Sequence, residues 1–268
     1  MDSKSISKEN KVELNSKNYF DNLKSDYFIQ KVFVNIKRNK SLTIIKYNKK
    51  MQNRLNINIK DYKEYSELYS SIEVEIIPIK NEYGKFINIK GDKSYYHIYF
   101  NDDKKEIKKY SINKDDKISK IKIIIDYQIK SFGKLFNYCD CIESINFKKF
   151  HRNNITDMSY MFWGCLALKE LTLNNFNTNN VTDMCLMFSE CSSLKDLNLN
   201  NFNTNNVTDM SFMFWRCSSL KELNLNNFNT NNVTNMRGMF SKCSDELKLK
   251  LKSKFNEFKE EAFEDYED

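Results

Sequence analysis

Apolar side chains recur along the second half of the chain with a spacing of 26 residues. Methionines stand at 158, 184, 210 and 236, and cysteines at 165, 191, 217 and 243. The stretch "NNFNTNNVTDM" begins at Asn174, returns at Asn200, and returns at Asn226 with one substitution. A fixed period of 20–30 residues is the signature of a repeat architecture in which neighbouring units stack.

One unit starts at Leu168 with "LKELTLNNF", where apolar and polar residues alternate. This alternation predicts a short strand with one buried face. The Asn- and Thr-rich run that follows is typical of a turn. Next, Met184, Met187, Phe188 and Cys191 fall at i, i+3, i+4 and i+7, which predicts a short helix. We therefore expect strand, turn and helix in each unit, with the strands of neighbouring units forming a parallel sheet.

The pattern L-x-x-L-x-L-x-x-F-x-T-x-x-V-x-x-M-x-x-M-F-x-x-C resembles the BspA-like leucine-rich repeats. It is matched by residues 168–191, 194–217 and 220–243, and more loosely by 142–165. The resemblance covers about residues 119–243, or about five coils. It implies an α/β repeat solenoid that contacts other proteins, in a family without common catalytic residues.

The flanking segments have different patterns. Residues 1–18 are polar and predict a disordered N-terminus, and residues 71–118 predict a β-rich N-terminal cap with strands such as "SIEVEIIPI", "KFINIK" and "YYHIYF". Residues 244–268 predict a C-terminal capping helix with an acidic tail. The apolar positions of that helix are Leu247, Leu251, Phe255, Phe258 and Ala262.

Residues 19–70 predict a helical hairpin, because Ile29, Val32, Phe33 and Ile36 have helical spacing. Val32, Val34 and Ile36 also alternate, so a strand stays open there. The layout of two helices joined by a short basic turn is similar to an F-box. That resemblance implies a substrate-recognition adaptor that docks on a subunit of a cullin-type ubiquitin ligase.

Composition narrows the class of protein. The 268 residues are 40% hydrophobic and 29% charged, with 5 Gly and 1 Pro, which indicates a globular chain and excludes collagen-like or Gly-rich architectures. Residues 150–243 carry seven basic and seven acidic side chains, and residues 244–268 carry five and nine. The net charge of +7 therefore leaves +11 on the first 149 residues. These lysines are scattered, so we expect no nucleic-acid binding.

No run of about 20 apolar residues is present, so we expect no membrane span. The N-terminus has no apolar core of a signal peptide, which favours a cytoplasmic location, with the cell surface as the alternative.

Two surfaces are candidates for partner binding. The outward positions of the predicted strands form a strand face, where repeat proteins commonly bind: Glu170, Thr172, Asp196, Asn198, Glu222 and Asn224. Large side chains beside the predicted helices form a convex patch: Tyr160, Trp163, Phe212, Trp215 and Arg216. The convex residues fit either a contact patch or packing between coils.

The sequence contains few residues in patterns that indicate catalysis or metal binding. Five cysteines recur once per coil and predict a buried ladder of free thiols: Cys139, Cys165, Cys191, Cys217 and Cys243. No zinc spacing, phosphate-binding loop or nucleophile–histidine pair accompanies them or the two histidines. We therefore expect neither enzyme activity nor a cofactor or metal. The favoured function is a non-catalytic protein-interaction scaffold with an unidentified protein partner. The ligase adaptor and a surface adhesin are the alternatives.

Overall fold

The computed structural model describes residues 48–58 and 69–267, together with the single residues 25, 27, 29, 60, 61 and 63. The chain forms two compact units, Met1–Tyr69 and Ser70–Asp268. In the first unit, helix α4 (Lys49–Arg54) begins at Asn48, whose side chain accepts a hydrogen bond from the Met51 amide at 3.0 Å. Most of the predicted hairpin at 19–70 lies outside the described residues.

The second unit begins with a five-stranded mixed sheet in the order β3-β5-β1-β6-β7. Strand β1 (Ile72–Pro78) lies between β5 (Ile121–Ile125) and β6 (Ile142–Lys149) and runs antiparallel to both. Strand β3 (Tyr96–Phe100) pairs with β5 at one edge, and a short 3-10 turn, η1 (Lys93–Tyr95), precedes it. Buried and half-buried residues alternate along β1, β3 and β5, so one face of the sheet covers the core.

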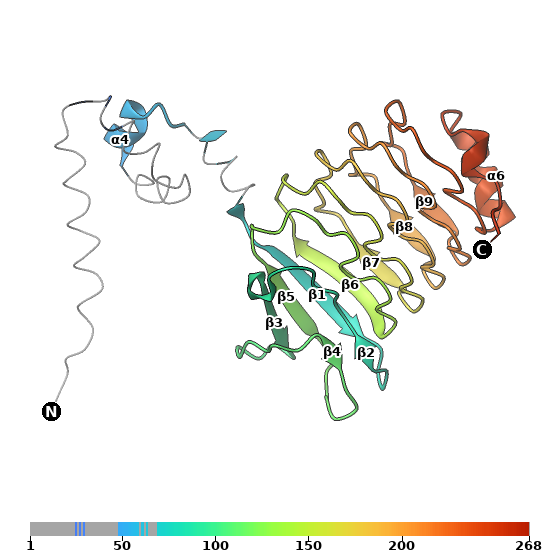
Figure 1. The fold of residues 1–268 in the computed structure, drawn as a ribbon, viewed down its shortest axis with the longest axis horizontal. Coiled ribbons are helices and arrows are strands. Elements are labelled where there is room, and N and C mark those ends of the chain that lie inside the picture. Colours follow the sequence, from blue (N-terminus) through green and yellow to red (C-terminus); the bar gives the residue numbers. More distant parts are fainter. Residues whose placement is uncertain are drawn as a thin grey trace. The chain divides into compact units, whose positions relative to one another are not determined.

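Shorter strand pairs complete the sheets. Strand β2 (Gly84–Lys85) pairs antiparallel with β4 (Ser111–Ile112). Strand β7 (Glu170–Thr172) pairs parallel with β6, and β8 (Asp196–Asn198) pairs parallel with β9 (Glu222–Asn224). Figure 1 shows β6 to β9 following one another towards helix α6 (Asp245–Lys254).

The predicted fold class, a leucine-rich-repeat solenoid with a parallel sheet and a helix in each coil, is wrong. Within residues 70–267 the only α-helix is α6, which follows the last repeat. The first sheet is mixed, because antiparallel β1 stands between β5 and the parallel pair β6–β7. The parallel pairing also does not continue from β7 to β8, which belong to separate sheets. The second unit is therefore a stack of sheet-rich turns on a mixed sheet.

Turns replace the predicted helices because alternate backbone amides donate to carbonyls of the next repeat instead of to carbonyls of their own repeat. The amides of Tyr160 and Phe162 donate to the carbonyls of Cys185 and Met187, at 2.8 and 2.9 Å. Between them, the Met161 amide donates to the Met158 carbonyl three residues earlier, at 3.3 Å. An α-helix requires bonds four residues back in the same segment. The same alternation recurs from Phe132 to Phe240.

Two positions in each repeat have left-handed backbones, which also interrupts any helix. The first position is occupied by Lys134, Tyr160, Leu186, Phe212 and Gly238. The second is occupied by Tyr138, Gly164, Glu190, Arg216 and Lys242. These chained turns still direct side chains at i, i+3, i+4 and i+7 inward, so an apolar pattern of helical spacing arises without a helix.

Two columns of stacked phenylalanines run through the core. The rings of Phe136, Phe162, Phe188, Phe214 and Phe240 follow one another with centroids 5.5–5.7 Å apart and planes within 8° of parallel. Phe150, Phe176 and Phe202 form a second column. Stacking of like on like favours the same side chain at the same place in every repeat.

The polar residues of the repeated motif form hydrogen bonds with neighbouring repeats. The Thr204 hydroxyl donates to the Asn229 carbonyl at 2.9 Å and accepts from the Asn229 amide at 2.7 Å. The Asn206 side chain donates to the Asn179 carbonyl at 2.6 Å, and Thr208 donates to the Thr182 carbonyl at 3.2 Å. Thr204 is buried and must be paired, whereas Asn206 and Thr208 are exposed. All three bond to a neighbouring repeat, which favours the same motif in each copy.

The C-terminal segment covers the last repeat. The amides of Gly238 and Phe240 donate to the carbonyls of Glu261 and Ala262, at 2.8 and 2.7 Å, as earlier repeats donate to the next one. The continuous helix predicted from Leu247 to Ala262 is wrong. Helix α6 ends at Lys254, and the chain then turns through the 3-10 segment η2 (Glu260–Ala262).

Candidate functional site

The residues of the strand face lie on β7, β8 and β9, next to α6. A groove of about 440 Å³ lies between β8, β9 and α6. Of the six predicted residues, Asp196, Asn198, Glu222 and Asn224 line it, whereas Glu170 and Thr172 do not. Its other lining side chains are Leu171, Leu197, Leu223, Leu247, Lys250, Leu251 and Lys254. The groove therefore combines leucines with a carboxylate wall on the strands and a lysine wall on the helix.

The local sequence explains why helix α6 forms the lysine wall of the groove. Ser244 accepts a hydrogen bond from the Leu247 amide at 3.3 Å, which begins α6. Acidic residues occupy its first turn and lysines its last, in line with the helix dipole. Leu247 and Leu251, four residues apart, are buried, so the neighbouring lysines face the groove.

The polar groups of the groove are not equally available. The side-chain oxygens of Asn198 and Asn224 accept the amides of Asn200 and Asn226, at 3.0 and 3.1 Å, so they hold the turns. Glu222 pairs with Lys250 at 2.6 Å. Asp196 is exposed, and its carboxylate has no hydrogen bond or ion pair with any described residue. Asp196 is thus the carboxylate of the groove that no other described residue engages.

The convex patch forms two clusters of half-buried rings. Tyr160 lies 5.4 Å from Trp163, and Phe212 lies 6.3 Å from Trp215, measured between ring centroids. The Arg216 guanidinium lies 4.4 Å above the Trp215 ring. In the repeat between the clusters, Leu186 and Ser189 take the corresponding positions, so no continuous aromatic band forms.

The five repeated cysteines are buried, and all seven cysteines are free. The thiols of Cys165, Cys191, Cys217 and Cys243 each donate to a phenylalanine carbonyl 29 residues earlier, at 3.0–3.3 Å. Cys139 instead faces the Asn137 carbonyl. Burial raises the pKa of Cys165 and of Cys243 to about 12. The part of the chain that the structure describes contains no group of three side chains arranged to hold a metal ion.

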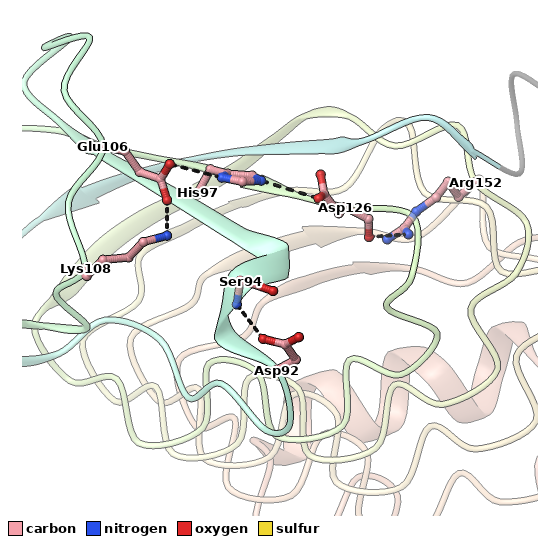
Figure 2. Close-up of polar contacts among 7 residues, drawn as sticks. All are labelled: Asp92, Ser94, His97, Glu106, Lys108, Asp126 and Arg152. Atoms are coloured by element: carbon pink, nitrogen blue, oxygen red, sulfur yellow. Dashed lines mark hydrogen bonds and ion pairs between the residues drawn. The ribbon is translucent and has the colours of Figure 1, made fainter. Parts of the chain in front are cut away.

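A polar cluster on the first sheet was missed by sequence reasoning. Figure 2 shows the His97 ring between two carboxylates, with Nδ1 3.2 Å from Glu106 and Nε2 3.4 Å from Asp126. Lys108 also pairs with Glu106, and hydrogen bonds from Lys108 and His97 hold the pKa of Glu106 below its usual range. Strand alternation places His97 on a sheet surface, but no local signal links it to residues 9 and 29 positions away.

Next to Asp126, Arg152 is fully buried. Its Nη1 donates to the carbonyls of Asp126 and Ile129, at 2.8 and 3.1 Å, as Figure 2 shows for Asp126. Burial lowers the pKa of Arg152 to about 10. Arg152 occupies the repeat position of Thr178 and Thr204, so it joins the first repeat to the preceding turn. Both ring nitrogens of His97 face carboxylates, so His97 links strand β3 to two loops. The residues named in this cluster include no nucleophile.

Comparison with known proteins gives one family. Residues 130–253 match a family described as "Mycoplasma protein of unknown function, DUF285". The match covers 124 of the 268 residues, slightly less than half of the chain, so the chain is similar to that family over its repeats. No curated protein and no solved structure matches the chain.

These findings correct both resemblances drawn from the sequence. The family match is neither to BspA-like leucine-rich repeats nor to an F-box. The leucine-rich-repeat and F-box assignments are therefore wrong, and the matched family carries no known activity. Among the described residues, no helix is long and apolar enough to cross a membrane.

Proposed function

We propose that the protein is a non-catalytic scaffold that binds a segment of a partner protein in the groove between β8, β9 and α6. The observation that carries the proposal is the exposed Asp196 carboxylate beside the leucines of the groove. Leu171, the half-buried leucine of the groove, offers apolar contact area, and a charge at the rim orients the ligand. The repeated asparagines are engaged in internal bonds and Lys250 is paired with Glu222, so specificity comes from Asp196 and Lys254.

We further propose that this scaffold acts in the cytoplasm. All seven cysteines are free, as is usual in a reducing compartment. The side-chain nitrogens of Asn180, Asn206 and Asn232 donate to backbone carbonyls at 2.6 Å. A glycan on these Asn-x-Thr sites would replace one of the two hydrogens on each of these nitrogens and would compete with those bonds. Microscopy of the tagged full chain in its native cells tests this location, and staining confined to the cell surface would contradict it.

The groove is tested by crosslinking in native cells. A photoreactive residue at Asn198, which lines the groove, is compared with one at Asn205, which is exposed in a turn outside it. We expect a protein crosslinked from position 198 and absent from position 205. That protein, once purified, must bind the unmodified chain in a titration. Crosslinking that is equal from both positions, or a product that fails to bind, would contradict the proposal.

A further inference from the structure

A second hollow, of about 680 Å³, is formed by the end of β1, the turn after it and the loop after β4. Its lining includes five branched or cyclic apolar side chains: Ile77, Pro78, Ile79, Ile112 and Ile118. Tyr83 also lines the hollow and is 40% exposed, which is high for a large aromatic side chain. Exposed apolar area of this kind is typical of an interaction site.

The loop that forms one wall is held in place by side-chain hydrogen bonds. Asp116 accepts from the Asn113 amide at 2.7 Å and from the Lys109 ammonium at 2.6 Å. Asn101 donates to the Lys117 carbonyl at 2.6 Å and accepts from the Ser119 amide at 2.8 Å. A wall ordered before binding loses little entropy when a ligand arrives, so the hollow is preorganised.

The charges around the hollow are unbalanced. Lys80, Lys114 and Lys117 line it and are exposed, as is one carboxylate, Glu82. The other two lining carboxylates are already neutralised: Asp116 by Lys109, and Glu143 by Lys169 at 2.9 Å. Three ammonium groups therefore surround an apolar floor, with one acidic group left to oppose them. This combination suits a ligand that carries both carboxylates and an apolar side chain.

We propose that this hollow docks an acidic segment of a partner protein, with an apolar side chain of that segment on the isoleucine floor. The lysines at the rim would pair with its carboxylates. A nucleic acid would also meet the lysines, but its phosphates would leave the apolar floor unused. The surface shares no residue with the groove at α6, so the scaffold would hold two different ligands.

The test starts with selection of random twelve-residue peptides on the full chain, followed by titration of the selected peptides with a fluorescent label. We expect peptides rich in Asp and Glu with at least one large apolar residue. The triple variant K80E/K114E/K117E should weaken their binding at least tenfold. The matched control K104E/K105E/K130E changes the net charge equally at exposed lysines outside the hollow, and should weaken binding less than threefold.

Several outcomes would overturn the proposal. One is the selection of peptides without acidic enrichment, or of none at all. Another is an equal loss of affinity in both triple variants, which would indicate long-range charge alone. Displacement of the labelled peptide by a short RNA or DNA duplex, with the duplex binding more tightly, would assign the hollow to nucleic acid. The groove variant Asp196→Lys should leave peptide binding unchanged, so failure of this proposal and of the groove are distinguishable.

Discussion

The thiol of Cys217 donates a hydrogen bond to the backbone carbonyl of Phe188, 29 residues earlier, at a sulfur–oxygen distance of 3.0 Å. Both residues are fully buried, and the same contact recurs in neighbouring repeats. The cysteine column is thus a set of polar links between repeats. This role explains why a thiol, and not only a small apolar group, recurs at that position.

Replacing Cys217 tests these links. We expect Cys217→Ala to lower the free energy of unfolding by about 1–2 kcal/mol, because it leaves a small cavity and removes one of the two hydrogen bonds of the Phe188 carbonyl, which keeps the bond from the Cys191 amide. Cys217→Ser retains a donor and should preserve more stability than Cys217→Val, which retains volume but not the bond. Urea unfolding of the three variants gives the order. If Cys217→Val is more stable than Cys217→Ser, the hydrogen bond contributes less to stability than the volume of the side chain.

The reactivity of the thiols reports their burial. Burial raises the pKa of Cys165 to about 12, so almost no thiolate exists at pH 8 in the folded protein. Cys185, the half-buried cysteine, also has its pKa raised to about 12 by burial. We expect a thiol reagent at pH 8 to modify the native protein slowly and to find seven thiols after unfolding. Rapid modification of several thiols in the native state would contradict the buried column.

Gly164 allows two repeats to approach closely. Its φ is +71°, and a Cβ atom there would lie 2.5 Å from Cδ1 of Tyr138 in the previous repeat. We expect Gly164→Ala to cost about 2–4 kcal/mol, combining backbone strain with the clash. Gly91 has a φ of +82° and open space around it, so Gly91→Ala measures the strain alone. Equal losses in both variants would show that Tyr138 gives way without cost.

Acid should weaken the hydrogen bonds of the Asp157 carboxylate. Asp157 accepts hydrogen bonds from Ser131 Oγ at 2.6 Å and from Ser159 Oγ at 2.7 Å. Burial alone would raise the pKa of Asp157, but these bonds outweigh it and hold the pKa below its ordinary value of 3.8. A lowered folded pKa stabilises the protein above about pH 4, and that stabilisation is lost as the pH falls through the folded value.

Asp157→Asn should therefore lower the free energy of unfolding by about 1 kcal/mol at pH 7. The difference from the wild-type protein should shrink below pH 4, as measured by urea unfolding across pH 3–7. The exposed Asp140, changed to Asn, controls for the loss of one charge. A difference that stays constant down to pH 3 would show that the carboxylate charge does not stabilise this contact.

Part of this architecture could be predicted from the sequence, because the 26-residue spacing is visible in it. The parallel bridges that join Asp157 to Asp183 and Asp183 to Asp209 have the same spacing. The helices could not be predicted correctly, since Met184, Met187, Phe188 and Cys191 have the apolar spacing of a helix. In the folded chain alternate amides of this segment donate to carbonyls of the neighbouring repeat, whereas in a helix they would donate within the segment. The apolar spacing of the segment itself does not distinguish the two cases.

The candidate sites also depend on contacts that the sequence alone does not reveal. The strand-face residues could be listed by counting positions, but the roles of Asn198 and Asp196 differ only through hydrogen bonds in the folded chain. The lysine wall of the groove depends on α6 packing beside β9. His97 and its two carboxylates, like the lysines of the second hollow, come from segments that are separated along the chain. No local pattern in the sequence brings them together.

The most direct test of the scaffold proposal is a titration of the crosslinked and purified partner with two charge variants of the full chain. Asp196→Lys reverses the unpaired carboxylate of the groove, and Asp140→Lys reverses an exposed carboxylate two repeats earlier. We predict that Asp196→Lys weakens partner binding at least tenfold, whereas Asp140→Lys weakens it less than twofold. Equal affinities for the wild-type chain and Asp196→Lys would contradict the assignment of the groove as the binding site.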